Sequence, residues 1–452
     1  MIFKRKIYNQ LLNWKKEVNG EKALLIEGAR RIGKSTIVEE FAKNEYKSYI
    51  LIDFSIASNF IKEAFFNNLN NLDTFYMLLN AEYHTNLYNR KSLIIFDEIQ
   101  KFPKAREAIK YLVKDGRYDF IETGSLISIK ENVKNITIPS EERKIKMYPM
   151  DFEEFCDAIG EKQIYEYLRY CYEKMVPVDN GFHKRAISFF YEYMLVGGMP
   201  KVVSKYIESG KNFKVADEEK RDIISLYRDD ILKISENYKT KVLSIFDQIP
   251  AFLSKHEKRV RISNIDNSSS PAYETTFFWL SESMIANECF NSEDPNVGLS
   301  LNEDRSFIKC YMGDTGLLIS HTFDENQLIS ENLYLSILNG KLSINKGMFF
   351  ENIVAQSLVA NGHNPYFYTH YNAEKHRNDI EIDFIISSSG NKINNRIIPI
   401  EVKSSKNYTT TSLSLFKQKF KERIDKCYII HPKNLMVKDE IIYLPAYMAG
   451  FV

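Results

Sequence analysis

Cysteine is scarce in this 452-residue chain, and its five cysteines are widely spaced without a C-x-x-C pair. This spacing excludes a disulfide framework and a zinc site built on paired cysteines. Unpaired thiols are typical of a reducing compartment, so we expect a cytoplasmic protein. The five residues are Cys156, Cys171, Cys289, Cys310 and Cys427.

The chain also lacks an excess of one charge and any long apolar run. It has 61 Lys and Arg residues against 60 Asp and Glu residues, a net charge of +1. This balance excludes a protein that coats nucleic acid over its whole surface, but it leaves a local basic site open. No uncharged run of 18 apolar residues occurs, so we predict no membrane span. Residues 1–17 lack the apolar core of a signal peptide and predict an amphipathic helix.

A P-loop motif lies near the N-terminus. An apolar strand predicted over Ala23–Glu27 leads into Gly28, and Gly33, Lys34 and Ser35 complete the pattern G-x-x-x-x-G-K-[ST]. Backbone N–H groups of such a loop approach phosphate oxygens, which side chains at the two glycines would obstruct. Lys34 can reach the β- and γ-phosphates of ATP, and Ser35 can bind Mg²⁺. A Gly-rich surface turn is the alternative. The predicted nucleotide-binding residues are Gly28, Ala29, Arg30, Arg31, Ile32, Gly33, Lys34, Ser35 and Thr36.

An acidic pair ends a later apolar strand, Lys91–Glu98. At the tip of a parallel strand beside the first, Asp97 would hold Mg²⁺ through its water shell. Glu98 would orient and deprotonate the water that attacks the γ-phosphate. A solvated turn is the alternative. Adjacent acids suit water activation better than transfer to a bound hydroxyl, which disfavours a small-molecule kinase.

Two further polar groups follow in the same part of the chain. A strand predicted over Tyr118–Ser125 would place Thr123 beside the γ-phosphate if the sheet is parallel. A strand-to-loop turn is the alternative. Arg143 is a candidate for contacting nucleotide charge, in its own site or across a subunit boundary of a homo-oligomer, and a solvated arginine is the alternative.

Four segments together resemble the AAA-type ATPases of bacteria and archaea that carry a C-terminal domain of uncharacterised function. They are GARRIGKST, LIIFDEIQ, the ETGS strand and YPMDFEEF at Tyr148–Phe155. The resemblance implies the additional-strand form of the P-loop sheet and the phosphate and magnesium contacts given above. It also implies that Glu98 is the catalytic base and Thr123 a polar sensor. The family often has Gly-Arg where this chain has Glu142-Arg143.

The middle of the chain predicts helices and few strands. Residues 151–235 have helical periodicity and are interpreted as a lid, interrupted by Gly197–Pro200. This Gly-Gly-Met-Pro step is either a nucleotide-sensing hinge or a plain turn between helices. Residues 236–330 are compatible with a winged-helix-like region, a fold that binds DNA or packs against protein partners. Asp314, in a Gly-Asp-Thr-Gly-Leu segment similar to one in the family, has no predicted chemical role.

The C-terminal part, residues 331–452, places acids and a lysine on successive elements. Glu351 lies on an amphipathic helix predicted over Lys346–Leu358. Asp383 lies near the end of a strand, and Glu401 and Lys403 project from one face of the next strand because strand side chains alternate. Carboxylates converging from adjacent strands suit Mg²⁺, and a nearby lysine can activate water for phosphodiester attack.

This set is similar to the PD-(D/E)xK nuclease core. The resemblance implies that Asp383 and Glu401 bind metal, that Lys403 is the catalytic lysine and that Glu351 is an accessory acid. Glu381 and Ile382 stand where the pattern has a proline before the aspartate. Such sets persist in domains that bind without cutting, so cleavage and binding both remain open. His370 and His376, in a predicted polar loop, are interpreted as solvated side chains, with metal ligation as the alternative.

We therefore predict an α/β protein with a P-loop ATPase core over residues 1–150, the lid, the winged-helix-like region and a restriction-endonuclease-like domain. The predicted function is Mg²⁺-dependent ATP hydrolysis that drives a switch in a nuclease-like domain, with DNA preferred to RNA as partner. The rival is an ATP-driven signalling switch whose inactive C-terminal domain binds a protein.

Overall fold

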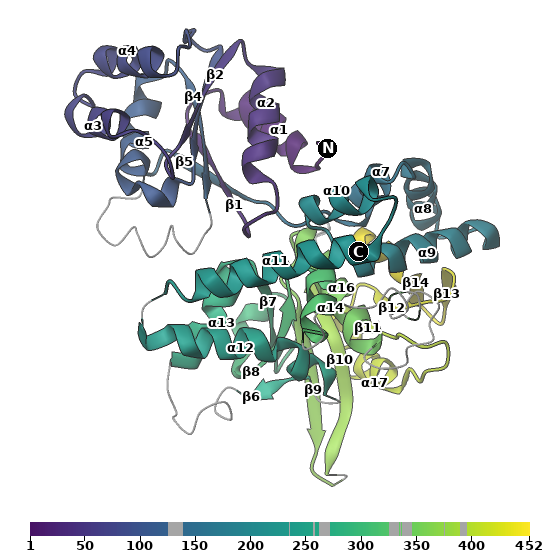
Figure 1. Cartoon of the computed structure of the whole chain (residues 1–452). Helices are drawn as coiled ribbons and strands as arrows, with labels where there is room; N and C mark the ends of the chain where they lie inside the picture. The colour runs from purple at the N-terminus through teal and green to yellow at the C-terminus, as the bar shows by residue number, and fades with distance from the viewer. Residues whose placement is uncertain are drawn as a thin grey trace. The chain divides into compact units, whose positions relative to one another are not determined.

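The chain divides into two compact units (Figure 1). Residues 1–148 with 282–284 form the first unit, and residues 149–281 with 285–452 form the second. Ser125, which ends a predicted strand, lies outside the described residues. The computed structural model describes residues 1–124, 139–234, 236–255, 258–261, 272–324, 334, 336, 346–374, 376–388 and 396–452.

A parallel sheet of five strands forms the centre of the first unit, in the order β2, β3, β4, β1, β5. All residues of β1, β3 and β4 are buried, as expected for a parallel sheet with both faces covered. Since β4 lies between β1 and β3, the prediction that the Asp97 strand adjoins the P-loop strand is wrong. The strands are β1 (Ala23–Glu27), β2 (Ser48–Asp53), β3 (Ser92–Asp97), β4 (Asp119–Gly124) and β5 (Glu142–Lys146).

Helices cover the sheet of the first unit. The apolar spacing of Phe60–Leu79 is typical of a helix, but this segment lies in two helices because residues 68–71 are not helical. There the Asn71 side chain accepts a hydrogen bond from the Thr74 backbone and caps the second helix. The described helices are α1 (Ile7–Val18), α2 (Lys34–Glu45), α3 (Asn59–Asn67), α4 (Leu72–Glu82) and α5 (Pro103–Asp115).

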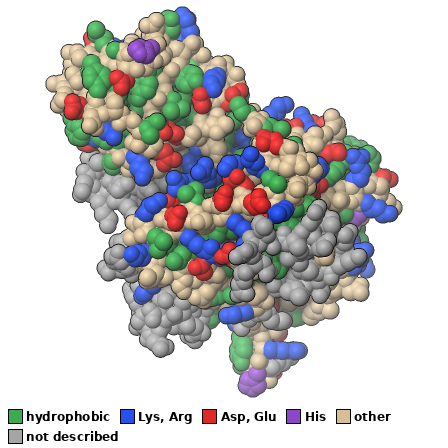
Figure 2. Space-filling model, in the orientation of Figure 1, with side chains coloured by type: hydrophobic (Ala, Val, Ile, Leu, Met, Phe, Trp, Pro, Cys, Tyr) green, Lys and Arg blue, Asp and Glu red, His purple; other side chains and the backbone are tan. Residues whose placement is uncertain are grey.

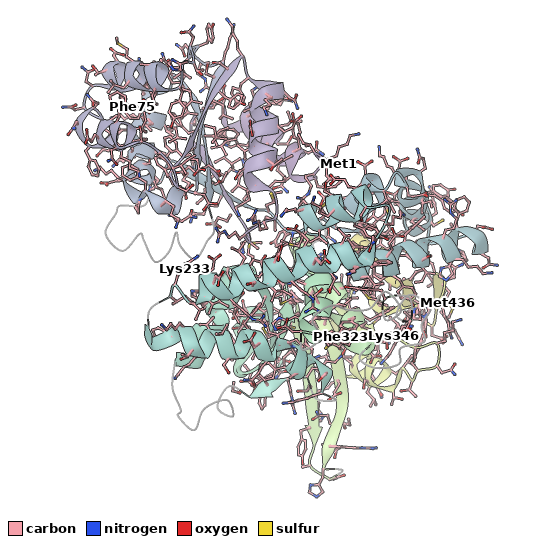
Figure 3. The ribbon with its side chains drawn as sticks, in the orientation of Figure 1. Met1, Phe75, Lys233, Phe323, Lys346 and Met436 are labelled. Atoms are coloured by element: carbon pink, nitrogen blue, oxygen red, sulfur yellow. The ribbon has the colours of Figure 1, made fainter. Side chains whose placement is uncertain are left out.

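Aromatic rings fill the core beneath α3 and α4. Phe65 of α3 makes edge-on contacts with Phe54, Phe75 and Phe96 at centroid distances of 5.0–5.7 Å. Figure 3 labels Phe75 within this group. Such pairs add stabilisation beyond the burial of their area. This packing supports β3, whose end carries Asp97.

The second unit begins with helices, as predicted for residues 151–235. Strands follow them, together with further helices and the short 3₁₀ helices η4 (Leu299–Asn302), η5 (Lys421–Arg423) and η6 (Ala446–Phe451). The described α-helices are α7 (Phe152–Ala158), α8 (Lys162–Lys174), α9 (Asn180–Val196), α10 (Pro200–Glu208), α11 (Phe213–Ile231), α12 (Glu236–Ser254), α13 (Ala272–Glu282), α14 (Thr315–Thr322), α16 (Lys346–Ala360) and α17 (Thr411–Lys419).

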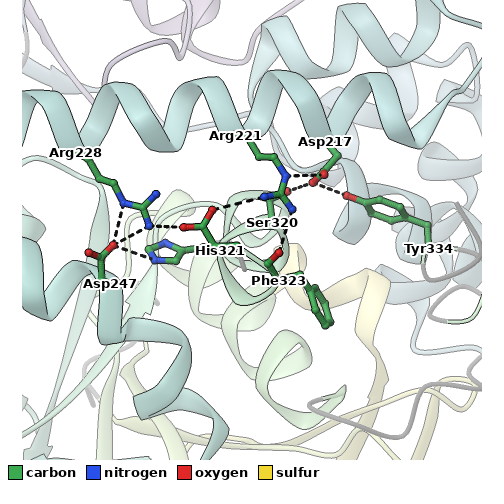
Figure 4. Close-up of polar contacts among 9 residues, drawn as sticks. Asp217, Arg221, Arg228, Asp247, Ser320, His321, Phe323 and Tyr334 are labelled. Atoms are coloured by element: carbon green, nitrogen blue, oxygen red, sulfur yellow. Dashed lines mark hydrogen bonds and ion pairs between the residues drawn. The ribbon is translucent and has the colours of Figure 1, made fainter. Parts of the chain in front are cut away.

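A polar network joins α11, α12 and α14 (Figure 4). Arg228 of α11 donates to Asp247 of α12 at 2.9 Å and to Asp324, which follows α14, at 2.6 Å. Further along α11, buried Asp217 accepts a 2.6 Å hydrogen bond from Ser320 of α14. Helices from the predicted lid and from the predicted winged-helix-like region therefore share one set of contacts.

A mixed sheet continues from the middle of the chain into its C-terminal part. Its order is β13, β14, β12, β11, β10, β9, β7, β8, β6, and β7 pairs in parallel with β9. Strands from residues 236–330 thus extend the C-terminal sheet, so the prediction of a separate winged-helix-like region is wrong. The strands are β6 (Val260–Arg261), β7 (Ala286–Ser292), β8 (Glu303–Met312), β9 (Tyr366–Asn372), β10 (Arg377–Ser387), β11 (Ile397–Val402), β12 (Cys427–His431), β13 (Met436–Lys438) and β14 (Ile441–Pro445).

The surface and the cysteines agree with the composition. All five cysteines are buried and free, which confirms the prediction of unpaired thiols. On the face in Figure 2, Lys and Arg side chains lie interspersed with Asp and Glu. Among the helices in the described ranges, none has the length and apolar character needed to cross a membrane.

Candidate active sites

The loop between β1 and α2 has the backbone that phosphate binding requires. A Cβ atom on Gly28 would lie 2.5 Å from the Met147 carbonyl oxygen, so no side chain fits there. Gly33 has φ +90°, a left-handed conformation that only glycine adopts readily, and it starts α2. Arg31 within the loop is also left-handed, with φ +69°. The loop is held as a tight turn against the N-terminus of α2, where an anion is favoured.

Lys34 is buried in this loop and folded over its backbone. Its Nζ donates to the carbonyl oxygens of Gly28 at 2.9 Å and Ala29 at 2.8 Å. Burial lowers the pKa of Lys34 to about 8, although the charges of Glu98 and Asp97 oppose this shift. Burial disfavours the charged form of Lys34, and phosphates bound at this loop would stabilise it again.

The lowered pKa of Lys34 predicts a pH dependence of ATP affinity. The free protein loses the Lys34 proton as pH rises through about 8, whereas phosphate binding favours the charged amine. We expect the Kd for ATP to stay constant below pH 7.5 and to rise by about tenfold per pH unit above pH 8. Equilibrium binding of a fluorescent ATP analogue measures this. A Kd that stays flat to pH 10 would contradict it, and the Lys34→Arg variant, whose charge does not titrate, is the control.

Asp97 joins the loop to the end of β4. Its Oδ1 accepts a 2.8 Å hydrogen bond from Ser35 Oγ and another from Thr123 Oγ1. Asp97 is 7% exposed and Thr123 is 1% exposed. The structure therefore brings together three side chains predicted from separate segments. A serine hydroxyl beside a carboxylate is an oxygen donor set that fits Mg²⁺ bound to a triphosphate.

Glu98 follows β3 in an unusual backbone conformation. Its φ of 53° and ψ of 45° are left-handed, which for a residue with a side chain costs about 1–3 kcal/mol. Gln100 Nε2 donates to Glu98 Oε2. Sequence reasoning did not single out Gln100. The only signal for it in the sequence was its position two residues after the acidic pair. A residue of the same turn therefore orients the Glu98 carboxylate.

The predicted acids of β10 and β11 lie opposite one another. Phe384 pairs with Ile400 in this antiparallel ladder, so Asp383 faces Glu401 across the strands. Asp383 Oδ2 also accepts a 2.8 Å hydrogen bond from the Val402 backbone. Lys403 Nζ lies 3.0 Å from Glu401 Oε2. Burial, only partly offset by the charge of Lys403, raises the pKa of Glu401 to about 7.

Glu351 has different partners from those predicted. Its carboxylate accepts hydrogen bonds from Tyr311 at 2.5 Å, from Lys309 at 3.3 Å and from Lys258. Burial would raise the pKa of Glu351, but the charges of Lys309 and Lys258 outweigh it and lower the pKa to about 2. Lys309 Nζ also lies 3.8 Å from Asp383 Oδ1, between the two acids.

In the described part of the chain, no group of three or more His, Cys, Asp or Glu side chains could hold a metal ion. A buried ammonium stands between Glu351 and Asp383 instead. Sequence reasoning missed Lys309, although a lysine among the apolar residues of Ser306–Met312 was a signal of it. His370, on β9 rather than in a loop, pairs with Asp379 at 2.7 Å, and His376 is exposed.

Family models match three segments of the chain. Residues 20–156, which contain the loop, Asp97 and Thr123, match the model described as AAA domain. The chain carries an AAA-type P-loop ATPase domain. Residues 187–327 and 346–447 each match a domain of unknown function, DUF8612 and DUF4143. These two models meet in the continuous sheet of the second unit, since β7 and β8 lie in one and β9 to β12 in the other.

Two solved structures are similar to the chain at low sequence identity. The Walker-type ATPase PABY2304 of Pyrococcus abyssi is 15% identical, with a TM-score of 0.40 over 71% of this chain and 96% of that one. Cdc6p from Pyrobaculum aerophilum is 11% identical, with a TM-score of 0.27 over 76% and 97%. No curated protein matches the chain.

Arg143 of the AAA domain is not placed at its own phosphate loop. It pairs with Leu24 near the start of β1, whereas the loop begins beyond Glu27 at the other end of the strand. Its guanidinium is half exposed and lies 3.5 Å from Glu17. The neighbouring Glu142 is instead buried, in a two-bond pair with Arg106 at 2.9 and 3.0 Å. A role for Arg143 within its own site has no support from this geometry.

A second buried acid of the AAA domain was also missed. Glu122 of β4 is fully buried, and neither carboxylate oxygen has a hydrogen-bond partner in the described structure. Burial and then the charge of Glu142 raise the pKa of Glu122 well above its usual range. Strand alternation places it on the sheet face opposite Thr123. It thus stands one residue from the predicted sensor but outside the nucleotide site.

Asp314 gains a structural role. Its Oδ2 accepts a 2.6 Å hydrogen bond from the Gly198 backbone, and its Oδ1 accepts one from Leu317 that caps α14. A Cβ atom on Gly198 would lie 2.1 Å from the Met150 carbonyl oxygen. The Gly-Gly-Met-Pro step is therefore a tight crossing of three chain segments within the second unit.

Proposed function

We propose that the AAA domain hydrolyses ATP with Mg²⁺ and that its nucleotide state switches the second unit. One observation carries the proposal: Lys34, Ser35 and Asp97 meet at a single loop, in which Gly28 has no room for a side chain. A structural turn would not need a buried lysine with a lowered pKa. The same geometry is suited to stabilising the charge that develops on transferred phosphate.

Each residue has a separate part in this proposal. Lys34 binds the β- and γ-phosphates, and Ser35 with Asp97 holds Mg²⁺, which when bound neutralises charge on the phosphate oxygens. Thr123 senses the γ-phosphate through the Asp97 carboxylate that it already contacts. Glu98 takes the proton of the attacking water. Arg143 completes a neighbouring site in a homo-oligomer, since its place on β5 is away from its own loop.

We further propose that the second unit engages nucleic acid, with DNA preferred to RNA. The elements from α16 to β12 run helix, three strands, helix, strand. They present Asp383 on β10, Glu401 on the adjacent β11, and Lys403 directly after β11. This is the arrangement expected of a PD-(D/E)xK-like core. Lys258 and Lys309 add positive charge beside it, which suits a phosphate backbone.

Binding without cleavage is the second candidate, and Lys309 favours it. Its ammonium lies between Glu351 and Asp383, within 3.3 and 3.8 Å of their oxygens, where a cation shared by these acids would have to bind. The residues present therefore do not fit a three-carboxylate magnesium site. We derive no cleavage step from them.

One pair of assays tests these proposals on the full chain. ATP hydrolysis is measured without nucleic acid and with single-stranded DNA, double-stranded DNA and RNA. Labelled DNA is incubated with the protein and Mg²⁺ or Mn²⁺. A change of its electrophoretic mobility then reports binding, and shorter fragments report cleavage. We expect DNA to bind, to stimulate hydrolysis and to remain intact. An ATPase rate unaffected by any nucleic acid, with no shifted DNA, would support the signalling switch that binds a protein.

If labelled DNA is cut, two variants decide the origin of the activity. Cleavage by this centre must disappear in Asp383→Ala and in Lys403→Ala, because one removes a carboxylate and the other removes the lysine beside Glu401. The exposed Glu422→Ala change on the same unit is the matched control and must leave cutting unchanged. Cutting that survives in both site variants would identify a contaminant.

A further inference from the structure

Arg5, which lies outside every predicted motif, donates a hydrogen bond to the phosphate loop. Arg5 lies in the chain before α1 and is 9% exposed. Its Nη1 donates to the Ile32 carbonyl oxygen within the loop at 2.9 Å. Its Nη2 donates to the Tyr148 carbonyl oxygen at 2.6 Å. One planar guanidinium therefore bridges two backbone segments that are 116 residues apart in sequence, from Ile32 to Tyr148.

The same two segments also touch directly. The Met147 backbone N–H donates to the Glu27 carbonyl oxygen at 2.8 Å, just before the loop begins. At Gly28 the Met147 carbonyl oxygen fills the space that a Cβ atom would need. Residues 147–148 therefore contact the loop at its start through Gly28 and near its end through Arg5 and Ile32. A displacement of the loop by phosphate would act on these two residues.

Two residues beyond Tyr148, hydrogen bonds also hold the backbone of Met150. The Met150 N–H donates to the Gly198 carbonyl oxygen at 2.7 Å, and the Met150 carbonyl oxygen accepts a 2.8 Å hydrogen bond from Tyr193. Gly198 is itself fixed by Asp314. Between the anchor at Tyr148 and the anchor at Met150 there is only Pro149, whose ring fixes its φ angle.

We propose that Arg5 is a positioning residue of the ATP site, which fixes the phosphate loop against residues 147–148 and so links nucleotide binding to Met150 and Gly198. The inference rests on the proposed ATPase function. Two fixed donors are needed, because the two carbonyls belong to different segments. Lysine offers a single point charge and cannot reproduce the fork. Arg5 touches no reacting atom in this role.

The first test separates positioning from folding. In Arg5→Ala we expect the KM for ATP to rise roughly tenfold while kcat stays within about twofold, because the loop is formed less often but its chemistry is intact. Millimolar guanidinium should lower the KM of this variant again, and methylammonium should not. Lys4→Ala, an exposed cation one residue away, is the control and should match the wild type.

Several results would overturn the inference. They are a KM in Arg5→Ala equal to that of Lys4→Ala, or a joint fall in kcat and folded fraction without guanidinium rescue. If Arg5→Ala does not fold, Arg5→Lys is measured, and a wild-type KM in that variant overturns the inference too. A wild-type chain that hydrolyses no ATP would instead refute the proposed ATPase function, so the two failures are distinguishable.

The second test addresses the link to the second unit. Hydrogen exchange is followed in peptides that cover residues 147–151 and 196–200, with and without saturating ADP. We expect ADP to slow exchange at Met150 and Gly198 in the wild type and in Lys4→Ala, and to have at most half that effect in Arg5→Ala. Exchange that ADP leaves unchanged in the wild type, or slows equally in Arg5→Ala, would overturn the link.

Discussion

Replacement of Glu98 by glutamine is expected to leave ATP binding intact and to slow hydrolysis by about 10²–10⁴-fold. The amide has the shape of the carboxylate but cannot accept the proton of the attacking water. The left-handed backbone at Glu98 should persist, since it belongs to the turn rather than to the charge. Single-turnover hydrolysis of labelled ATP, with the Kd measured separately, isolates the chemical step.

A control substitution of the same type is available for Glu98→Gln. Glu63 is an exposed glutamate on α3, and Glu63→Gln should hydrolyse ATP at the wild-type rate. The Gln100→Ala variant is informative as well, because Gln100 orients the Glu98 carboxylate and its loss should slow hydrolysis by less. Wild-type turnover in Glu98→Gln would remove Glu98 from the role of base.

Loss of the Lys34 amine is expected to abolish measurable ATP binding. In the structure this amine donates hydrogen bonds to two carbonyl oxygens of the loop, and with ATP it would contact the phosphates. Lys34→Ala therefore removes both an attractive charge and two loop hydrogen bonds. We expect the Kd for ATP to rise by 100-fold or more, on the order of 3 kcal/mol. Calorimetric titration measures it.

The control for Lys34→Ala must remove a lysine without touching the loop. Lys91 is exposed just before β3, and Lys91→Ala should bind ATP as the wild type does. Unfolding temperatures of both variants show whether the loss of binding is local. Binding that survives in Lys34→Ala at the wild-type affinity would contradict the assignment of the loop to phosphate.

In the AAA domain, sequence reasoning located the segments that carry the residues of the proposed ATP site. Glycine spacing and apolar strands are local signals, so the loop, α2 and the ends of β3 and β4 were predictable. The motifs alone placed β3 beside β1, because strand order depends on long-range pairing. In the structure β4 lies between β1 and β3, in agreement with the additional-strand form that the family resemblance implies. Strand β5 was missed because its sequence ERKIK is mostly charged and resembles a loop. Its partner β1 supplies the hydrogen bonds that make it a strand.

In the second unit, local patterns were a poorer guide. The helix with Glu351 and the strands with Asp383 and Glu401 were found because each has its own periodicity. The residues that surround Glu351 come from distant elements, Lys258 before β6 and Lys309 and Tyr311 on β8. No spacing rule connects these positions. The winged-helix-like region was predicted because sequence alone cannot show that β7 joins β9.

The pairing of β7 with β9 bears on how this protein can be dissected. A fragment that ends before residue 346 would leave the edge of β7 without its partner, and a fragment that starts there would leave β9 equally bare. Unpaired edges of this kind recruit other chains. The segments that match DUF8612 and DUF4143 should therefore unfold together and be inherited together. A recombinant fragment of the second unit should begin at residue 149 and keep both segments.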